Sequence, residues 1–262
     1  MLRTRIITAV VALAIFAAVL FVVPAKYTEA IIALLVLAGA WEWSGFLGLR
    51  SVAGRAAYGV LIAALMAVMV FVAPQYSEQL LQIACVWWFI AFIWTFFFPT
   101  PIPVVIRWIC GTLVLVPVFV ALLTLYRLSP QYLLFALAIV WAADVGAYFS
   151  GKMFGRVKLA PNISPGKTWE GVFGGLVLVS VLTVAWAIYA DMKIVVLLPF
   201  CLAVAALSIV GDLTVSMFKR TAGVKDSGKL FPGHGGVLDR IDSVAAAAPL
   251  FALGLSRLGL LG

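Results

Sequence analysis

Long apolar runs dominate the chain and are broken at intervals by proline, glycine or charged residues. A helix needs about 20 predominantly apolar residues to cross a bilayer. The runs predict about nine membrane-spanning helices, although some are short enough that eight or ten spans would fit as well. The predicted fold class is therefore an all-α, polytopic integral membrane protein. The nine runs cover residues 6–23, 29–48, 56–73, 80–98, 104–123, 132–150, 171–190, 194–218 and 241–258.

The composition supports this fold class and excludes others. Of 262 residues, 65% are hydrophobic and 11% are charged, whereas about 25% of the residues in a soluble domain are charged. A mean hydropathy of +1.19 excludes an ordinary soluble globule and a disordered chain. The three cysteines all lie within apolar runs, which favours small buried side chains over a disulfide framework or a zinc site.

The distribution of basic residues predicts the orientation in the membrane. Arg3 and Arg5 precede the first apolar run, as in a signal peptide, but a second run follows directly, so we expect a retained first helix. With a cytoplasmic N-terminus, 13 lysines and arginines fall on inside segments and four on outside segments. Because basic loops stay in the cytoplasm, this orientation is favoured. The net charge of +8 then reflects these loops, and we expect no nucleic-acid partner.

Two stretches concentrate the polar residues. Residues 144–170 and 212–242 together hold 15 of the 28 charged side chains and six of the ten acids. Both stretches open into inside loops under the predicted topology. We therefore divide the chain into an N-terminal region, 1–130, with about five spanning helices, and a C-terminal catalytic region, 131–262. The cytoplasmic loops of the second region are 151–170 and 219–240.

Four aspartates are predicted to lie at a similar depth near the cytoplasmic interface. Asp144 and Asp212 lie inside the sixth and eighth runs, and an ionisable residue within a span indicates a functional site by default. Asp239 and Asp242 stand at the entry to the ninth run, on one face if that entry is helical. Clustered carboxylates without a set of histidines suit a hard cation such as Mg²⁺. Buried ion pairs and helix caps are the alternative explanation.

One helical face of the eighth run joins three kinds of polar group. Asp212, Ser216 and Lys219 have the spacing i, i+4 and i+7, which places them in one stripe. A carboxylate, a hydroxyl and an ammonium in a stripe could hold metal and phosphate together. A snorkelling lysine and a serine bonded to its own helix would explain Lys219 and Ser216, but not Asp212.

Two loops add candidate phosphate-binding groups. Residues 164–170 predict a helix start with Ser164 as N-cap and Pro165 in the first turn, where free N–H groups and Lys167 would attract phosphate. Gly166-Lys167-Thr168 is not a Walker A loop, because that motif needs glycine where this chain has Pro161. Residues 232–236 form a glycine-rich loop that carries His234, the single histidine.

These features predict a metal–carboxylate site, surrounded by lysine and arginine, for a phosphorylated and anionic substrate. They leave open an enzyme that transfers a phosphate-containing group and, as a different class of protein, a transporter. A transporter would more often place its charges near the bilayer midplane and contain repeats, which are not evident here.

The residues from Ser216 to Asp242 resemble the signature of the phosphatidate cytidylyltransferases, also called CDP-diacylglycerol synthases. The match includes Ser216-Met217-Phe218-Lys219-Arg220, Lys225-Asp226-Ser227-Gly228 and Phe231 to Asp242, over 27 residues without a departure. The segments 144–148 and 164–171 are also similar to that family. In residues 1–130 the resemblance is general, with Trp41-Glu42-Trp43 as a further match.

The resemblance implies a reaction and its participants. The phosphate of phosphatidic acid would attack the α-phosphorus of CTP, giving CDP-diacylglycerol for phospholipid biosynthesis and pyrophosphate. The alternative is a related CTP-dependent kinase of a lipid alcohol, which would need a base for its hydroxyl nucleophile and would release CDP. The resemblance further implies Mg²⁺ dependence, with K⁺ as an optional second cation, and a homodimer embedded among membrane lipids. The expected location is the cell (inner) membrane, with the active site facing the cytoplasm.

The resemblance also implies roles for individual residues. Asp212, Asp239 and Asp242 would be the metal ligands or lie beside them. The catalytic residues would be Asp212, Lys219, Asp239 and Asp144, the last lining the cavity. The substrate-binding residues would be Lys167, Ser216, Arg220, Lys225, Asp226, His234 and Arg240.

Overall fold

The computed structural model describes residues 16–228 and 235–258, and over these ranges the protein is almost entirely helical. The helices are α2 (Ala25–Phe46), α3 (Val52–Ala67), η1 (Val68–Val72), η2 (Pro74–Tyr76), α4 (Ser77–Thr95), α5 (Val104–Leu128), α6 (Pro130–Phe154), α7 (Trp169–Tyr189), α8 (Ile194–Thr221) and α9 (Leu238–Arg257). The two strands are β1 (Lys158–Ala160) and β2 (Ser164–Thr168). The all-α prediction is confirmed, apart from this hairpin.

Seven helices in the described part of the chain are long and apolar enough to cross a membrane. They correspond to the second through eighth predicted runs, with η1 continuing α3 and η2 leading into α4. The first run, 6–23, lies largely outside the described residues, although residues 16–21 are helical. The ninth run corresponds to α9, which is not among the seven.

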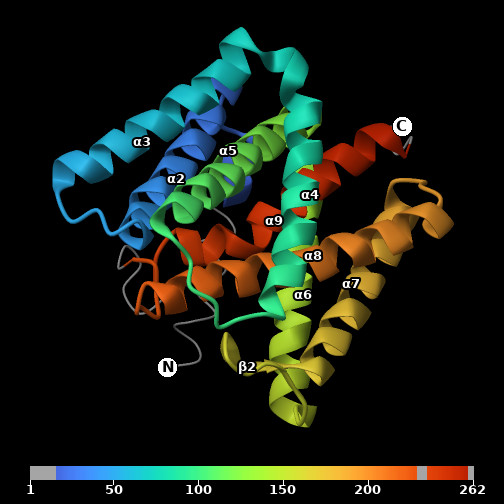
Figure 1. The fold of residues 1–262 in the computed structure, drawn as a ribbon. Coiled ribbons are helices and arrows are strands. Elements are labelled where there is room, and N and C mark those ends of the chain that lie inside the picture. The colour runs from blue at the N-terminus through green and yellow to red at the C-terminus, as the bar shows by residue number, and fades with distance from the viewer. Residues whose placement is uncertain (1–15, 229–234, 259–262) are drawn as a thin grey trace.

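Helix α9 has a central position among the other helices. It packs against α8, α5, α4, α6 and α2, and Figure 1 shows α4 crossing in front of α8 and α9. The run Val244–Pro249 is buried throughout and consists mainly of alanine. Because protein surrounds this helix, small side chains that allow close packing are favoured over large lipid-facing ones.

Polar contacts tie the helix ends together on two sides of the molecule. On one side, Arg127 at the end of α5 binds both oxygens of Glu29 at 2.8 Å, and Arg257 pairs with Glu78 at 2.5 Å. On the other side, Arg107 Nη1 donates to the carbonyl of Phe46 at 2.9 Å. These pairings agree with helices that alternate in direction across the membrane. In each pairing, the two helix ends in contact are ends that the predicted topology places on the same side.

The β-hairpin between α6 and α7 corrects the predicted helix start at Ser164. Lys158 pairs with Thr168 and Ala160 with Ser164 in antiparallel register, so Ser164 begins a strand. Helix α7 starts at Trp169, and the Thr168 side chain accepts from Gly171 N at 3.2 Å. The N-cap is therefore Thr168, because backbone pairing with β1 keeps residues 164–168 extended.

Glycines let α6 and α7 approach closely beneath the hairpin. A Cβ at Gly146 would lie 2.6 Å from the carbonyl oxygen of Gly174, and one at Gly175 would lie 2.7 Å from that of Ala143. Contacts this short require residues without a side chain, as at helix interfaces inside membranes. This packing fixes the hairpin, and with it Lys167, beside α6.

Candidate active site

The polar face predicted on α8 is present in the structure. Ser216 Oγ donates to Asp212 Oδ1 at 3.1 Å, one turn away on the same helix. Lys219 continues the stripe and is buried, with 7% of its surface exposed. A buried ammonium is costly to desolvate unless it has an anionic partner. The structure supplies two such partners from α9.

Lys219 joins the eighth helix to the start of the ninth. Its Nζ lies 2.8 Å from Asp239 Oδ1 and 3.8 Å from Asp242 Oδ2. Asp239 and Asp242 therefore point to the same side of α9. Gly211 permits the close approach of the two helices here, because a Cβ at this position would lie 2.4 Å from the Asp242 carbonyl oxygen.

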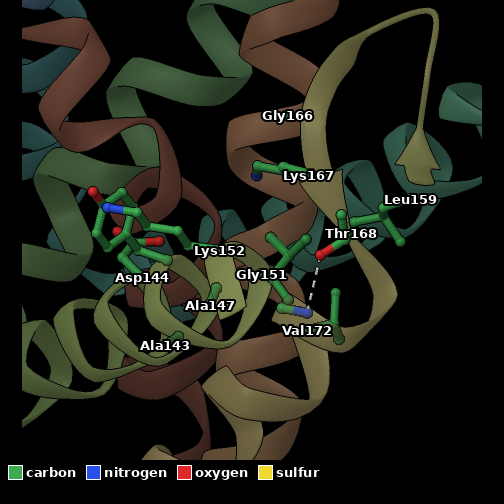
Figure 2. A pocket seen from close by; sticks show the side chains of 13 residues that line it. Ala143, Asp144, Ala147, Gly151, Lys152, Leu159, Gly166, Lys167, Thr168 and Val172 are labelled. Carbon is green, nitrogen blue, oxygen red and sulfur yellow. Dashed lines mark hydrogen bonds between the residues drawn. The ribbon is translucent and has the colours of Figure 1, made fainter. Parts of the chain in front are cut away.

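Strand β2 brings a second lysine to the same face of α8. Lys167 Nζ forms an ion pair with Asp212 Oδ2 at 2.7 Å, and both side chains are about one-quarter exposed. Lys167 also lines a cavity of about 360 Å³ between α6, the hairpin, α7 and α8. Figure 2 shows Asp144 and Lys167 among the residues around this cavity. The cavity combines charged groups with an apolar wall formed by Ala143, Ala147, Leu159, Val172 and Ile209.

The cluster places four carboxyl groups in one region of the structure, together with lysine side chains. Asp212 lies close enough to Asp144 and Asp242 for their charges to repel. The opposing cations among the described residues are Lys167, Lys219 and Arg240, the last acting on Asp144. Carboxyl groups packed this closely favour the binding of a further cation.

The carboxyl oxygens of this cluster are hard ligands of the kind that Mg²⁺ prefers. Within the described ranges, however, no three His, Cys, Asp or Glu side chains converge on one point as a ready-made metal site. Lys167 and Lys219 instead hold Asp212 and Asp239 at ion-pair distance. The donor set fits a magnesium ion chemically, and a bound ion would compete with these lysines for the same oxygens.

Asp239 also organises the loop that precedes α9. Its Oδ2 accepts hydrogen bonds from Ser227 N, Ser227 Oγ and Gly236 N, each at 2.9 Å. Gly235 has a φ of +81°, a conformation that glycine adopts without strain. A single carboxylate thus binds a lysine on one side and both flanks of the loop on the other.

Glu42 is a buried acid of this region that was not among the predicted site residues. It lies in the last turns of α2, and 9% of its surface is exposed. Its oxygens accept from Val237 N at 2.9 Å, Leu238 N at 2.8 Å and Ser227 Oγ at 2.8 Å. The sequence does contain a signal for Glu42. It is an acid within an apolar run, and the rule that selected Asp144 applies to it equally.

The remaining predicted residues lie around this centre. Arg220 Nε donates to the carbonyl of Ile163 at 3.2 Å, which ties the end of α8 to the hairpin. Lys225, Asp226 and Arg240 are exposed. His234 lies outside the described residues. The structure therefore brings Asp144, Lys167, Asp212, Ser216, Lys219, Asp239 and Asp242 together and places the other described candidates at the rim.

Comparison with known proteins gives a consistent result. The model of the cytidylyltransferase family matches residues 3–257. A phosphatidate cytidylyltransferase of Pseudomonas aeruginosa is 44% identical over 261 residues, covering 96% of both chains. One from Haemophilus influenzae is 36% identical and covers 96% of this chain and 98% of its own. One from Staphylococcus aureus is 48% identical over 122 residues, which are 46% of this chain and 47% of its own. The family match spans both polar stretches and nearly all the helices, so the chain belongs to the cytidylyltransferase family.

Proposed function

We propose that this membrane protein transfers the cytidylyl group of CTP to phosphatidic acid, forming CDP-diacylglycerol and pyrophosphate. The observation that carries the proposal is the pairing of Lys167 with Asp212 and of Lys219 with Asp239 beside a mainly apolar cavity that also contains charged groups. Two near-full-length relatives bear the name of this activity. The product is a precursor for phospholipid biosynthesis.

The chemistry suits the groups that are present. An oxygen of the lipid phosphate forms a bond to the α-phosphorus of CTP, and the bond from that phosphorus to the pyrophosphate oxygen breaks. The nucleophile is already an anion, so no general base is required. The obstacle is the repulsion between two polyanions, which fixed positive groups relieve. Lys167 and Lys219 are the buried or half-buried cations available for this purpose.

Each residue has a distinct part in this proposal. Lys167, on the cavity wall, binds a phosphate of CTP or of the lipid, and Lys219 neutralises charge at the α8–α9 junction. Asp144 lines the cavity and orients cationic groups, while Ser216 orients Asp212. The exposed Arg220, Lys225, Asp226 and Arg240 contact nucleotide at the rim. His234, outside the described residues, is proposed as a further nucleotide contact on the resemblance alone.

We also propose that Asp212, Asp239 and Asp242 hold Mg²⁺. The convergence of Asp239 and Asp242 on Lys219, with Asp212 on the facing helix, supports this assignment. When bound, the metal would neutralise charge on the leaving pyrophosphate. The lysines that contact these aspartates would then be released toward phosphate. The family resemblance leads us to add K⁺ as an optional helper, which replacing K⁺ with Na⁺ in the assay would test.

The proposed setting is the inner membrane of a bacterium, with the site facing the cytoplasm. The bacterial relatives and the 13 basic residues on the segments that share the site's side support this orientation. We propose a homodimer from the same resemblance, which cross-linking in the membrane would test.

The decisive experiment measures pyrophosphate release by the purified, detergent-solubilised protein with CTP and Mg²⁺, with and without phosphatidic acid. We expect release that requires the lipid and fails with ATP in place of CTP. Release of CDP with a lipid alcohol would instead identify a CTP-dependent kinase. No turnover of any nucleotide by folded protein would overturn the proposal and favour transport.

A further inference from the structure

Glu42 lies far from the signature in sequence but contacts it directly. The three hydrogen bonds that it accepts come from residues 185 to 196 positions further along the chain. Two of the donors are the backbone N–H groups of Val237 and Leu238, at the start of α9. N–H groups at the start of a helix have no partner within that helix. A carboxylate there satisfies them and interacts favourably with the helix dipole.

Gly228 and Gly236, on either side of residues 229–234, lie close to the Glu42 carboxylate. A Cβ at Gly228 would lie 2.2 Å from Glu42 Oε1, and a Cβ at Gly236 would lie 2.2 Å from Glu42 Oε2. Only glycine leaves room for the carboxylate at both positions. Glu42 therefore contacts both flanks of the segment and the helix that follows it.

Glu42 is also connected to the candidate catalytic groups through one hydroxyl. Ser227 Oγ lies 2.8 Å from Glu42 Oε2 and 2.9 Å from Asp239 Oδ2. A serine hydroxyl has one proton, so at any moment Ser227 Oγ donates to one of these two carboxylates, and its position between them links the two acids. Asp239 in turn binds Lys219 at 2.8 Å. The path from Glu42 to Lys219 is continuous: Glu42, Ser227, Asp239, Lys219.

We infer that Glu42 is a positioning residue for the nucleotide half of the reaction: it holds both flanks of the glycine-rich loop and the start of α9 so that Asp239 faces Lys219. The inference rests on the proposed function and adds to it a residue of the N-terminal half of the chain. Glu42 does not touch the cavity that Lys167 lines, since none of the cavity's residues comes from α2. The loop flank that Glu42 holds through Ser227 continues from Lys225 and Asp226, which the proposed function assigns to the nucleotide, so the effect of Glu42 should fall on CTP rather than on the lipid.

The test compares steady-state kinetics of the wild type and Glu42→Gln in detergent. A glutamine keeps the size of the side chain but loses one acceptor oxygen, so at least one donor in the loop is left unpaired. We expect the KM for CTP to rise and kcat to fall, with kcat/KM for CTP lower by about tenfold or more. The KM for phosphatidic acid should stay at the wild-type value.

A purely structural role would give a different pattern. It would lower the amount of active enzyme, and hence the maximal rate, without changing the KM for either substrate. That result, or wild-type kinetics throughout, would overturn the inference. Glu29→Gln is the matched control, because it makes the same change on the same helix, at an acid whose partner among the described residues is Arg127, on the opposite side. It should leave both KM values unchanged.

A second variant covers the case in which Glu42→Gln does not fold. Ser227→Ala removes the shared hydroxyl from the half-buried loop flank and leaves both carboxylates in place. It should raise the KM for CTP in the same direction, and by less. An unchanged KM for CTP in Ser227→Ala would overturn the inference. If the wild type itself releases no pyrophosphate, the proposed function fails, whereas an active wild type with unaltered variants contradicts only the role of Glu42.

Discussion

Lys219 and Asp239 form a buried ion pair, with 2.8 Å between Nζ and Oδ1 and about one-tenth of each side chain exposed. The pair connects the end of α8 to the start of α9, the two helices that border the signature loop. Asp242 adds a second acidic neighbour to Lys219 at 3.8 Å. One ammonium therefore compensates two carboxylates, and its removal should affect both stability and turnover.

Replacing this lysine tests that dual role. Lys219→Met leaves Asp239 and Asp242 buried without their cation, so we expect a loss of about 3 kcal/mol in the free energy of unfolding. Turnover of the folded fraction should fall on the order of 100-fold, because a fixed charge that stabilises the reaction is lost. Thermal unfolding in detergent and pyrophosphate release measure the two effects. Lys193→Met, at an exposed position, is the control and should change neither.

The carboxylates should control the requirement for Mg²⁺. We expect Asp212→Asn and Asp239→Asn to lower turnover on the order of 100-fold and to raise the Mg²⁺ concentration for half-maximal rate. Removing Mg²⁺ with EDTA should abolish activity of the wild type, and added Mg²⁺ should restore it. Asp191→Asn is a suitable control, because Asp191 is exposed and asparagine tolerates its positive φ of 52°. Near-wild-type turnover in both site variants would remove these residues from the metal assignment.

The second lysine should act on substrate binding. Lys167→Met removes a cation from the cavity wall and leaves Asp212 without its 2.7 Å partner. We expect the KM for at least one substrate to rise about tenfold, the effect of losing a charge-assisted hydrogen bond. Varying CTP and phosphatidic acid separately will show which phosphate this lysine binds. Lys158→Met makes the same change at an exposed position of the same hairpin. Equal KM values in both variants would contradict the role of Lys167.

The glycine contact between α6 and α7 should be needed for the shape of the cavity. Gly146→Ala would place a Cβ 2.6 Å from the Gly174 carbonyl oxygen, so the helices would have to separate. We expect a loss of about 2 kcal/mol in stability, as in other overpacked interiors, together with lower activity. Gly59→Ala, whose Cβ would meet no atom within 4 Å, should be neutral or slightly stabilising. An unchanged melting temperature for Gly146→Ala would show that the helices can separate freely.

The orientation of the site can be tested by chemical labelling. Cysteines introduced at the exposed Lys225 and Lys193 lie at opposite ends of α8. In intact cells a membrane-impermeant thiol reagent should label Lys193→Cys and spare Lys225→Cys, while inside-out vesicles should give the reverse. The opposite labelling pattern would place the signature loop outside and overturn the cytoplasmic assignment.

Much of the fold follows from local information in the chain. Apolar runs of spanning length predicted the positions of α2 to α8, because the bilayer imposes internal hydrogen bonding on every segment that crosses it. Asp144 and Asp212 were selected because they are acids within those runs. A carboxylate within a membrane span is costly to desolvate, so its presence indicates a function. The stripe of Asp212, Ser216 and Lys219 followed from helical spacing alone.

Other features depended on contacts between distant segments. Ser164 resembled a helix cap, but pairing with β1 extends residues 164–168 and transfers the cap to Thr168. Helix α9 matched a ninth span by length, whereas its packing among five other helices explains its alanine-rich interior. In both cases the neighbours of the segment, rather than its own sequence, decided its structure.

The sequence by itself determined that this chain is a helical membrane protein with a carboxylate–lysine cluster near one interface. Only the tertiary structure decided how that cluster is paired: Lys167 with Asp212, Lys219 with Asp239 and Asp242, and Glu42 with the loop before α9. The physical reason is the range of the interactions. Spanning length and helical periodicity are local properties of the chain, whereas an ion pair depends on which helix ends meet when all the helices pack.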